Sequence, residues 1–242
     1  MKRYPELDFA RGFAILLMAT YHTAFDLSQF YGWDIDVLSG GWKLLARVTA
    51  TLFLVIVGMG AAVSYERTKR DAPAGRLYGC AMRFIKIGSA ALLVSIATFV
   101  ANPDTFVRFG ILHLIAVSAL ILPLFAFLKE RTAILGIILI ALGPIVHVMR
   151  NDNPLFLPFG IRPMVFHTVD YFPMVPWFGV ILIGYAGGYF LYIRRHVETP
   201  QWGVSTGSAI MTWPGRHALL LYLIHQPIII GILWMLLGKP NM

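Results

Sequence analysis

The chain is organised as a series of long apolar stretches separated by short connections that carry most of its charge. Most stretches approach the roughly 20 residues that an α-helix needs to cross a bilayer. The fifth is the shortest, and Gly143-Pro144 interrupts it. The pattern predicts an all-α, polytopic membrane protein with about seven transmembrane helices, at Asp8–Leu27, Leu44–Tyr65, Met82–Ala101, Phe109–Phe127, Ala133–Met149, Met174–Tyr192 and Ala218–Leu237.

The composition supports a membrane protein. Hydrophobic residues make up 58% of the 242 residues and charged residues 13%, whereas a soluble domain carries about a quarter charged residues. No internal repeat, low-complexity tract or soluble domain is visible, so we expect residues 1–242 to form a single transmembrane domain. The one cysteine, Cys80, excludes an intramolecular disulfide and a cysteine metal cluster.

The basic residues orient the predicted helices. With the N-terminus inside, 14 of the 20 lysines and arginines fall on the cytoplasmic side and 6 outside, as the positive-inside rule requires. We therefore predict N-in and C-out in a cell membrane. This rule explains the net charge of +8 better than binding to nucleic acid does, and we expect no nucleic-acid partner.

The first apolar stretch contains an arginine and a histidine, Arg11 and His22. Ionisable side chains at that depth are costly and usually functional. Their separation of eleven residues amounts to three helical turns plus about 20°, so they share one face and lie about 16 Å apart along the axis. Asp8 and Asp26 extend the same polar stripe.

His22 and Asp26 are one helical turn apart. A carboxylate at that distance can hold an imidazole in one tautomer and raise its basicity, and histidine titrates near the pH at which a general base works. This spacing predicts that His22 is a catalytic base oriented by Asp26. The structural alternative is a hydrogen bond between helices.

Further polar side chains fall in or beside later stretches. His113 and Asp170 lie near the outer ends of two of them, and His225 lies in the last. Pro227 breaks a backbone hydrogen bond there, and Gln226 is placed to satisfy the freed carbonyl. Together with His22 and Asp26, these positions predict one polar cavity in the middle and outer half of the membrane.

The inner ends of several stretches carry basic residues that together suit a cytosolic anion, although each alone is explained by topology. They are Arg11, Arg83, Lys86 and Arg216. No histidine spacing suits a metal site, so we expect no metal. The small-residue surfaces at Gly58-x-Gly60 and Gly184-x-x-x-Gly188 favour close helix packing, either within the chain or in a homodimer.

These residues resemble two families of integral-membrane acyltransferases. Arg11 followed by His22 is similar to the Arg-x10-His signature of the acyltransferase-3 proteins. The order of further motifs over nearly the full length resembles bacterial members related to the catalytic domain of heparan-α-glucosaminide N-acetyltransferase. The motifs are Leu7-Asp8-Phe-Ala-Arg11-Gly12, His22-Thr-Ala-Phe-Asp26, Gly110-Ile-Leu-His113, Asp170-Tyr-Phe-Pro-Met-Val-Pro-Trp177 and Gly215-Arg-His-Ala-Leu-Leu-Leu-Tyr222-Leu-Ile-His225-Gln-Pro227.

The resemblance implies acyl transfer from cytosolic acetyl-CoA to a hydroxyl or amine, on a sugar-like acceptor, within or beyond a bacterial inner membrane. Arg11 would act on the acyl-CoA side and His22 would be the catalytic histidine. The acceptor-binding residues expected are His113, Asp170, Tyr171, Trp177, Tyr222, His225 and Gln226.

The chain departs from the lysosomal relatives, which are longer, have eleven spans and use a histidine in the loop after the first span. Residues 27–42 contain no histidine here, so glucosaminide specificity does not carry over. The main alternative is a transporter or flippase for a small-molecule or lipid-linked substrate, because a polar midplane cavity with broken helices suits that function too. A scaffold that only assembles partners is a third possibility.

Overall fold

The computed structural model describes residues 4–69, 71–197 and 206–239, and this part of the chain is helical, with two isolated β-bridges and no β-strand. It divides into two compact units, residues 1–53 with 199–242, and residues 54–198. Each unit is described by itself. The predicted all-α fold is confirmed.

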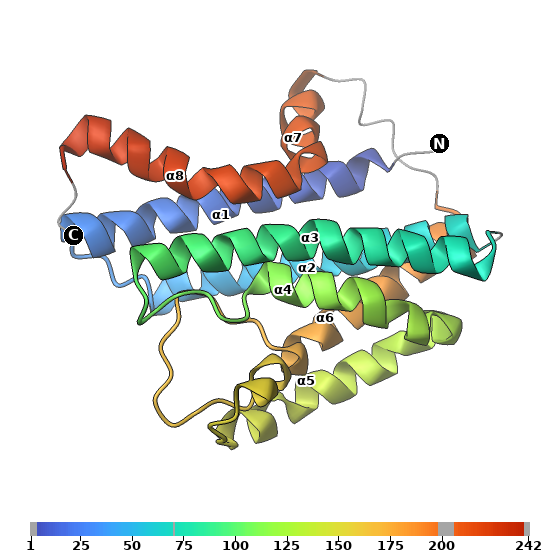
Figure 1. Ribbon diagram of the computed structural model, residues 1–242. Coiled ribbons are helices and arrows are strands. Elements are labelled where there is room, and N and C mark those ends of the chain that lie inside the picture. The colour runs from blue at the N-terminus through green and yellow to red at the C-terminus, as the bar shows by residue number, and fades with distance from the viewer. Residues whose placement is uncertain (1–3, 70, 198–205, 240–242) are drawn as a thin grey trace. The chain divides into compact units, whose positions relative to one another are not determined.

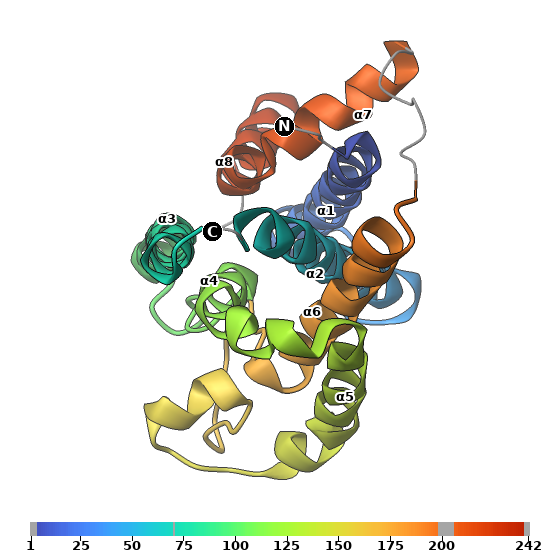
Figure 2. The ribbon, with the colours of Figure 1, turned by 90° about the vertical axis from the view of Figure 1, so that its right-hand side faces the viewer.

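The first unit is built around α1 (Pro5–Tyr31), which packs against α7 (Thr206–Arg216) and α8 (Ala218–Leu237); the unit also holds the start of α2 (Gly40–Thr68). Pro5 occupies the first turn of α1, where its missing N–H leaves no bond unmade. Gly32 ends the helix with a φ of 68°, in the left-handed region that glycine tolerates. Figures 1 and 2 show α7 near the N-terminal end of α1, and α8 running along it.

The polar stripe of α1 faces protein. Asp8 and Asp26 are buried together with Ile15 and Met18 of the same stripe, whereas Phe13 and Leu16 on the opposite side are 42% and 48% exposed. The helix therefore keeps its ionisable face inside and presents apolar side chains outside. This is the arrangement that a membrane favours for buried polar groups.

The second unit contains the rest of α2 and the helices from α3 to η3. In chain order these are α3 (Pro73–Ala101), α4 (Ile111–Ile121), η1 (Leu122–Arg131), α5 (Thr132–Val148), η2 (Pro154–Phe159), α6 (Met174–Gly188) and η3 (Tyr189–Arg194). α3 packs against α4, and α5 against α6 (Figure 2). Gly143-Pro144 do not end the fifth predicted helix, because α5 continues to Val148.

Close helix packing through glycine is observed within the chain. In the second unit, a Cβ added at any of five glycines would come within 2.7 Å of backbone atoms of a neighbouring helix, so the backbones touch there. Gly187 meets nothing within 4 Å. The contacts join Gly58 to Ile181, Gly184 to Val55, Gly188 to Met59, and Gly136 to Gly179 in both directions.

Five helical stretches of the described residues are long and apolar enough to cross a membrane: Gly40–Thr68, Pro73–Ala101, Ile111–Val148, Met174–Arg194 and Ala218–Leu237. The third, of 38 residues, joins α4 to α5, although the backbone departs from a helix at Lys129 (φ 55°, ψ −126°). α1 is not among the five, since its ionisable residues lower its hydropathy.

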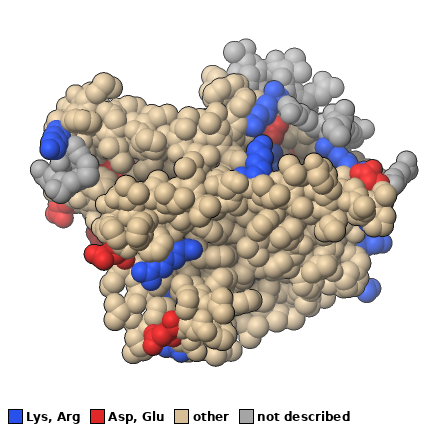
Figure 3. All heavy atoms as spheres, viewed as in Figure 1, with Lys and Arg blue, Asp and Glu red and all other residues tan. Residues whose placement is uncertain are grey.

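The outward side chains of α3 are apolar, with Leu92, Leu93 and Ile96 each more than 50% exposed. Uncharged side chains cover most of the face in Figure 3, where α3 lies in front. A soluble protein rarely exposes so large an apolar surface. The lipid bilayer is its natural solvent.

Candidate functional site

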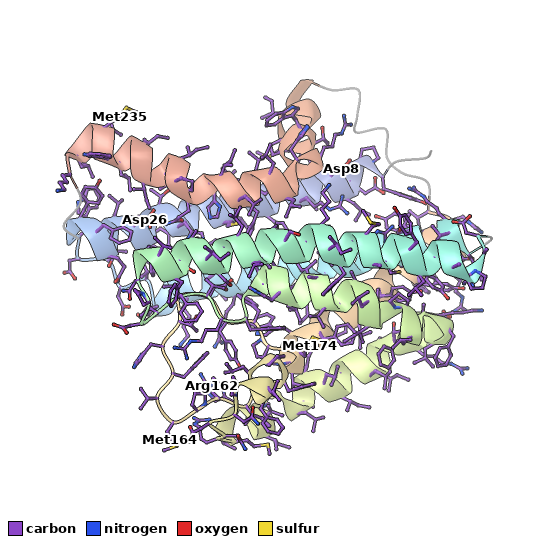
Figure 4. All side chains as sticks on the ribbon, in the orientation of Figure 1. Asp8, Asp26, Arg162, Met164, Met174 and Met235 are labelled. Atoms are coloured by element: carbon purple, nitrogen blue, oxygen red, sulfur yellow. The ribbon has the colours of Figure 1, made fainter. Side chains whose placement is uncertain are left out.

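Two clusters of polar side chains occupy opposite ends of α1. Asp8 marks the first and Asp26 the second (Figure 4). In the first cluster, Arg11 donates from Nη1 to Oδ1 of Asp8 at 2.8 Å, and Nε of Arg216 lies 3.7 Å from Oδ2. One carboxylate thus joins two guanidinium groups from α1 and α7.

Two glycines let α7 approach α1 at this point. A Cβ on Gly12 would lie 1.9 Å from the carbonyl oxygen of Met211, and a Cβ on Gly215 would lie 1.7 Å from that of Asp8. No larger residue fits either position without backbone movement. α7 was not among the helices predicted from the sequence, although its last residue, Arg216, was predicted to contribute to an anion site.

In the second cluster, the ring of His22 meets the ring of His225, from α8, edge-on with centroids 4.8 Å apart. Tyr21 and Phe25 also pack against the imidazole. The predicted hydrogen bond from His22 to Asp26 is not formed, and His22 has no hydrogen-bond partner in the described part of the chain. The orienting contacts of His22 are therefore aromatic.

Asp26 is fully buried and is bonded across the helix pair. Oδ1 of Asp26 accepts from Nε2 of Gln226 at 2.6 Å, so the carboxylate is bonded to α8 and not to His22. It also removes Gln226 from its predicted role at the carbonyl freed by Pro227. The sequence places both residues in the site but does not reveal that they bind each other, since they are 200 positions apart.

Three further atoms of this cluster are hydrogen-bond acceptors. Since the amide nitrogen of Gln226 faces the carboxylate, its Oε1 points elsewhere. His225 places Nδ1 2.7 Å from the carbonyl of Tyr222, so Nδ1 carries the proton and Nε2 keeps a lone pair. Oδ2 of Asp26, Oε1 of Gln226 and Nε2 of His225 are all buried and lack a partner in the described residues. We call these atoms the acceptor triad. Buried polar atoms are rarely left unpaired, so the triad suits a ligand that donates N–H or O–H groups.

The second unit has its own polar cluster, at the start of α4. Oδ2 of Asp170 accepts from the backbone N–H of Ile111 at 3.1 Å, and Nδ1 of His113 accepts from that of Gly110 at 3.2 Å. These side chains satisfy N–H groups that a helix start leaves unpaired. A Cβ at Gly110 would lie 2.1 Å from the Asp170 carboxylate, so a larger residue there would displace this side chain.

Both ring nitrogens of His113 are engaged. Because Nδ1 accepts a hydrogen bond, Nε2 carries the ring proton and faces the hydroxyl of Ser95 at 3.4 Å, and this hydroxyl in turn donates to the carbonyl of Val107 at 2.6 Å. The burial of Asp170 raises the pKa of its carboxyl to about 6. Unlike the acceptor triad, this cluster is satisfied by the protein itself.

The other predicted site residues have varied surroundings. Tyr171 donates its hydroxyl to the carbonyl of Leu157 at 2.7 Å, and burial raises the pKa of this phenol to about 12. Trp177 packs on Phe172. The two predicted anion-binding residues of α3 are exposed: Arg83 donates to the hydroxyl of Ser64, and Lys86 lies three positions further along.

No group of three or more metal-ligating side chains is present among the described residues. Asp8 belongs to the predicted stripe, but no role was predicted for it from the sequence. Its signal was available, since an acidic and a basic residue three apart on a helix commonly pair.

Comparison with known protein families gives one match, to the family described as heparan-alpha-glucosaminide N-acetyltransferase, catalytic, over residues 3–227. The chain belongs to this family. No curated protein and no solved structure matches it. The matched residues of this heparan-α-glucosaminide N-acetyltransferase family member include both clusters of α1 and the start of α4. Membership confirms the predicted resemblance to the heparan-α-glucosaminide N-acetyltransferase family and indicates a membrane acetyltransferase.

Proposed function

We propose that this protein transfers an acetyl group from cytosolic acetyl-CoA to an amine or hydroxyl of a sugar-like acceptor, within or beyond a bacterial inner membrane. Residues 1–242 would act as one transmembrane domain with seven crossings, N-in and C-out. The seven consist of α1, the separated α4 and α5, and the four other apolar stretches. A homodimer is compatible with this proposal.

The acceptor triad is the observation that carries the proposal. An acetyltransferase must bind a nucleophile that still holds its proton, that is, an N–H or O–H donor. Asp26, Gln226 and His225 offer only unpaired acceptors beside His22, and Tyr222 fixes the tautomer of His225. A nucleophile held there would satisfy buried groups that otherwise destabilise the protein.

His22 would act as the base. As the nucleophile attacks the thioester carbonyl, its proton passes to the His22 imidazole and a new C–N or C–O bond forms. The C–S bond breaks, and the imidazolium returns the proton to the departing thiolate. Acetyl-CoA would bind with its phosphates near Arg11 and Arg216, and its acyl arm would follow the stripe of α1 toward His22.

The cluster at the start of α4 has a different proposed role, which is structural. His113 and Asp170 each satisfy a backbone N–H at the start of that helix, and Tyr171 is bonded to a carbonyl. We therefore propose that they fix the start of α4 and the segment before α6 within the second unit. Trp177 stays a candidate for stacking on a sugar ring.

Thermal unfolding of the detergent-purified protein tests the proposal against a transporter. Acetyl-CoA at about 100 times its Kd adds about 2.7 kcal/mol to the stability of the folded state, or a rise in Tm of about 5–10 °C for a chain of this size. CoA should act similarly. A transporter for an unrelated substrate gives no shift with either compound, and that result would contradict the proposal.

The acceptor is identified by incubating the protein with radiolabelled acetyl-CoA and a panel of amino sugars, neutral sugars and lipid-linked glycans. Transfer to at least one of them is expected. Hydrolysis without transfer, across a panel that covers amines and hydroxyls, would contradict the acceptor class.

A further inference from the structure

We propose that Asp8 is a positioning residue which holds Arg11 and Arg216 together as a paired binding site for the phosphate groups of the acyl donor. The inference rests on the proposed function, because it concerns the donor end of the same site. It adds a residue that does not touch the reacting atoms and a reason for the close crossing of α1 and α7.

The contacts place Asp8 between the two arginines. Its Oδ1 accepts from Arg11 at 2.8 Å, and its Oδ2 lies 3.7 Å from Nε of Arg216. The Asp8 side chain is 11% exposed, whereas those of Arg11 and Arg216 are 28% and 45% exposed. The carboxylate is therefore enclosed, and the two guanidinium groups reach outward from it.

The charges of this group do not cancel. One carboxylate faces two guanidinium groups, so the cluster keeps a formal charge of +1. Without Asp8 the two cations would repel each other, and their long side chains would occupy many rotamers. With Asp8 they stay close enough to act on one anion.

The close crossing of the α1 and α7 backbones fixes the position of Arg216. Gly215 precedes it, and its Cα lies against the carbonyl of Asp8, so that a Cβ would come within 1.7 Å. Gly12, next to Arg11, makes the reciprocal contact with Met211. Arg11 and Arg216 are thus each next to a glycine at which the backbones of α1 and α7 touch. The two arginines are held together by this backbone contact as well as by their ion pairs with Asp8.

The chemistry of the free donors suits phosphate. A guanidinium presents five N–H groups in a fixed fork that matches phosphate oxygens. Asp8 engages one N–H of Arg11 and faces Nε of Arg216, and neither arginine has another hydrogen-bond partner in the described part of the chain. The outward amino groups are available for a phosphate or diphosphate.

The test compares two acyl donors that differ in phosphate. Acetyl-CoA carries the diphosphate and the 3′-phosphate, whereas S-acetylpantetheine carries neither but has the same thioester. We expect Asp8→Asn to raise KM for acetyl-CoA about tenfold, to leave kcat at saturation within about twofold, and to leave KM for S-acetylpantetheine unchanged. Asp34→Asn, at an exposed position of the same unit, is the matched control and should change neither KM.

A comparison of the single variants with the double variant of Asp8 and Arg216 distinguishes the proposed role from a general structural effect. Arg216→Gln alone should raise KM for acetyl-CoA, and Asp8→Asn should add little in the Arg216→Gln background, because residues that act as a unit are not additive. Arg216 is largely exposed, so this variant carries the test even if Asp8→Asn does not fold.

Equal KM changes for both donors, or no change for acetyl-CoA in Asp8→Asn and Arg216→Gln, would overturn the inference. This outcome is distinct from a failure of the proposed function, in which the unaltered protein transfers acetyl from neither donor.

Discussion

Asp8 and Asp26 are two carboxylates at opposite ends of one helix, and both are buried. Asp8 faces two arginines whose side chains reach outward. Asp26 faces an amide, and its second oxygen has no partner in the described residues. The first cluster is partly neutralised by Asp8, and its guanidinium groups can donate hydrogen bonds to an anion. The second cluster has unpaired hydrogen-bond acceptors, which suit a ligand with N–H or O–H groups. One helix thus carries complementary chemistry at its two ends, as transfer from a phosphate-bearing compound to an N–H or O–H nucleophile requires.

The histidines differ in the same way. His113 has both ring nitrogens engaged by Gly110 and Ser95, whereas His225 has one engaged and one free. A histidine with a bound lone pair supports structure. A histidine with a fixed tautomer and a free lone pair is ready to accept a proton or a hydrogen bond.

The largest expected effect on stability is at the Asp8 end of α1. Gly12→Ala places a methyl group 1.9 Å from a backbone oxygen, so α1 and α7 must separate. Overpacking of this kind destabilises a protein by about 1–3 kcal/mol or more. Thermal unfolding of the purified variant should show a clear fall in Tm.

Gly231→Ala in α8 is the matched control, because its added Cβ meets nothing within 4 Å. It should leave Tm unchanged or raise it slightly, since alanine favours helix by about 1 kcal/mol over glycine. Equal losses in the two variants would mean that the close crossing is not what stabilises this end.

At the Asp26 end of α1, Gln226→Met removes the one hydrogen-bond partner that Asp26 has among the described residues. A buried polar group left unpaired costs about 1–3 kcal/mol, and more when it is charged. The double variant Asp26→Leu with Gln226→Met should recover much of this loss, because both partners are then apolar. Both are compared by thermal unfolding. If the double variant is less stable than Gln226→Met, the bond between the two residues is not the source of the effect.

Asp170 provides a smaller, pH-dependent contrast, because burial disfavours the charged form of its carboxyl. Its pKa is raised from 3.8 to about 6 in the folded state. Its contribution to stability is therefore fully present below about pH 4 and is lost as the pH rises through 6. The loss is at most about 3 kcal/mol, at about 1.4 kcal/mol per pKa unit.

Asp170→Asn keeps an oxygen to accept from Ile111 but does not titrate. The Tm of this variant relative to the unaltered protein should thus be higher at pH 7 than at pH 4. A difference in Tm that is constant across this range would show that the carboxyl does not titrate there.

The sequence alone predicts the helical membrane fold, the stripe on α1 and the family. These depend on hydropathy and on spacing within one helix, which are local. The number of seven spans stays a prediction. The ionisable residues of α1 lower its hydropathy, so this helix is not among the five stretches that are apolar enough to cross a membrane.

The partners of the stripe could not be predicted. Asp26 pairs with Gln226 instead of His22, and Asp8 reaches Arg216, because both contacts join helices that are about 200 residues apart in the chain. Helical spacing finds which residues share a face but not what that face meets. The position of α7 also depends on tertiary packing, because α7 approaches α1 at Gly12 and Gly215. Nothing in the sequence distinguishes these two glycines from other small residues.

The central claim is that His22 accepts the proton of the nucleophile during acetyl transfer. The most direct measurement is the rate of transfer from radiolabelled acetyl-CoA by purified His22→Ala, with circular dichroism to confirm its fold and His167→Ala, at an exposed position, as the control. The account predicts a loss of about 10²–10⁴-fold for His22→Ala, the usual contribution of a general base, and full activity for His167→Ala. A folded His22→Ala protein that keeps the full rate would contradict it.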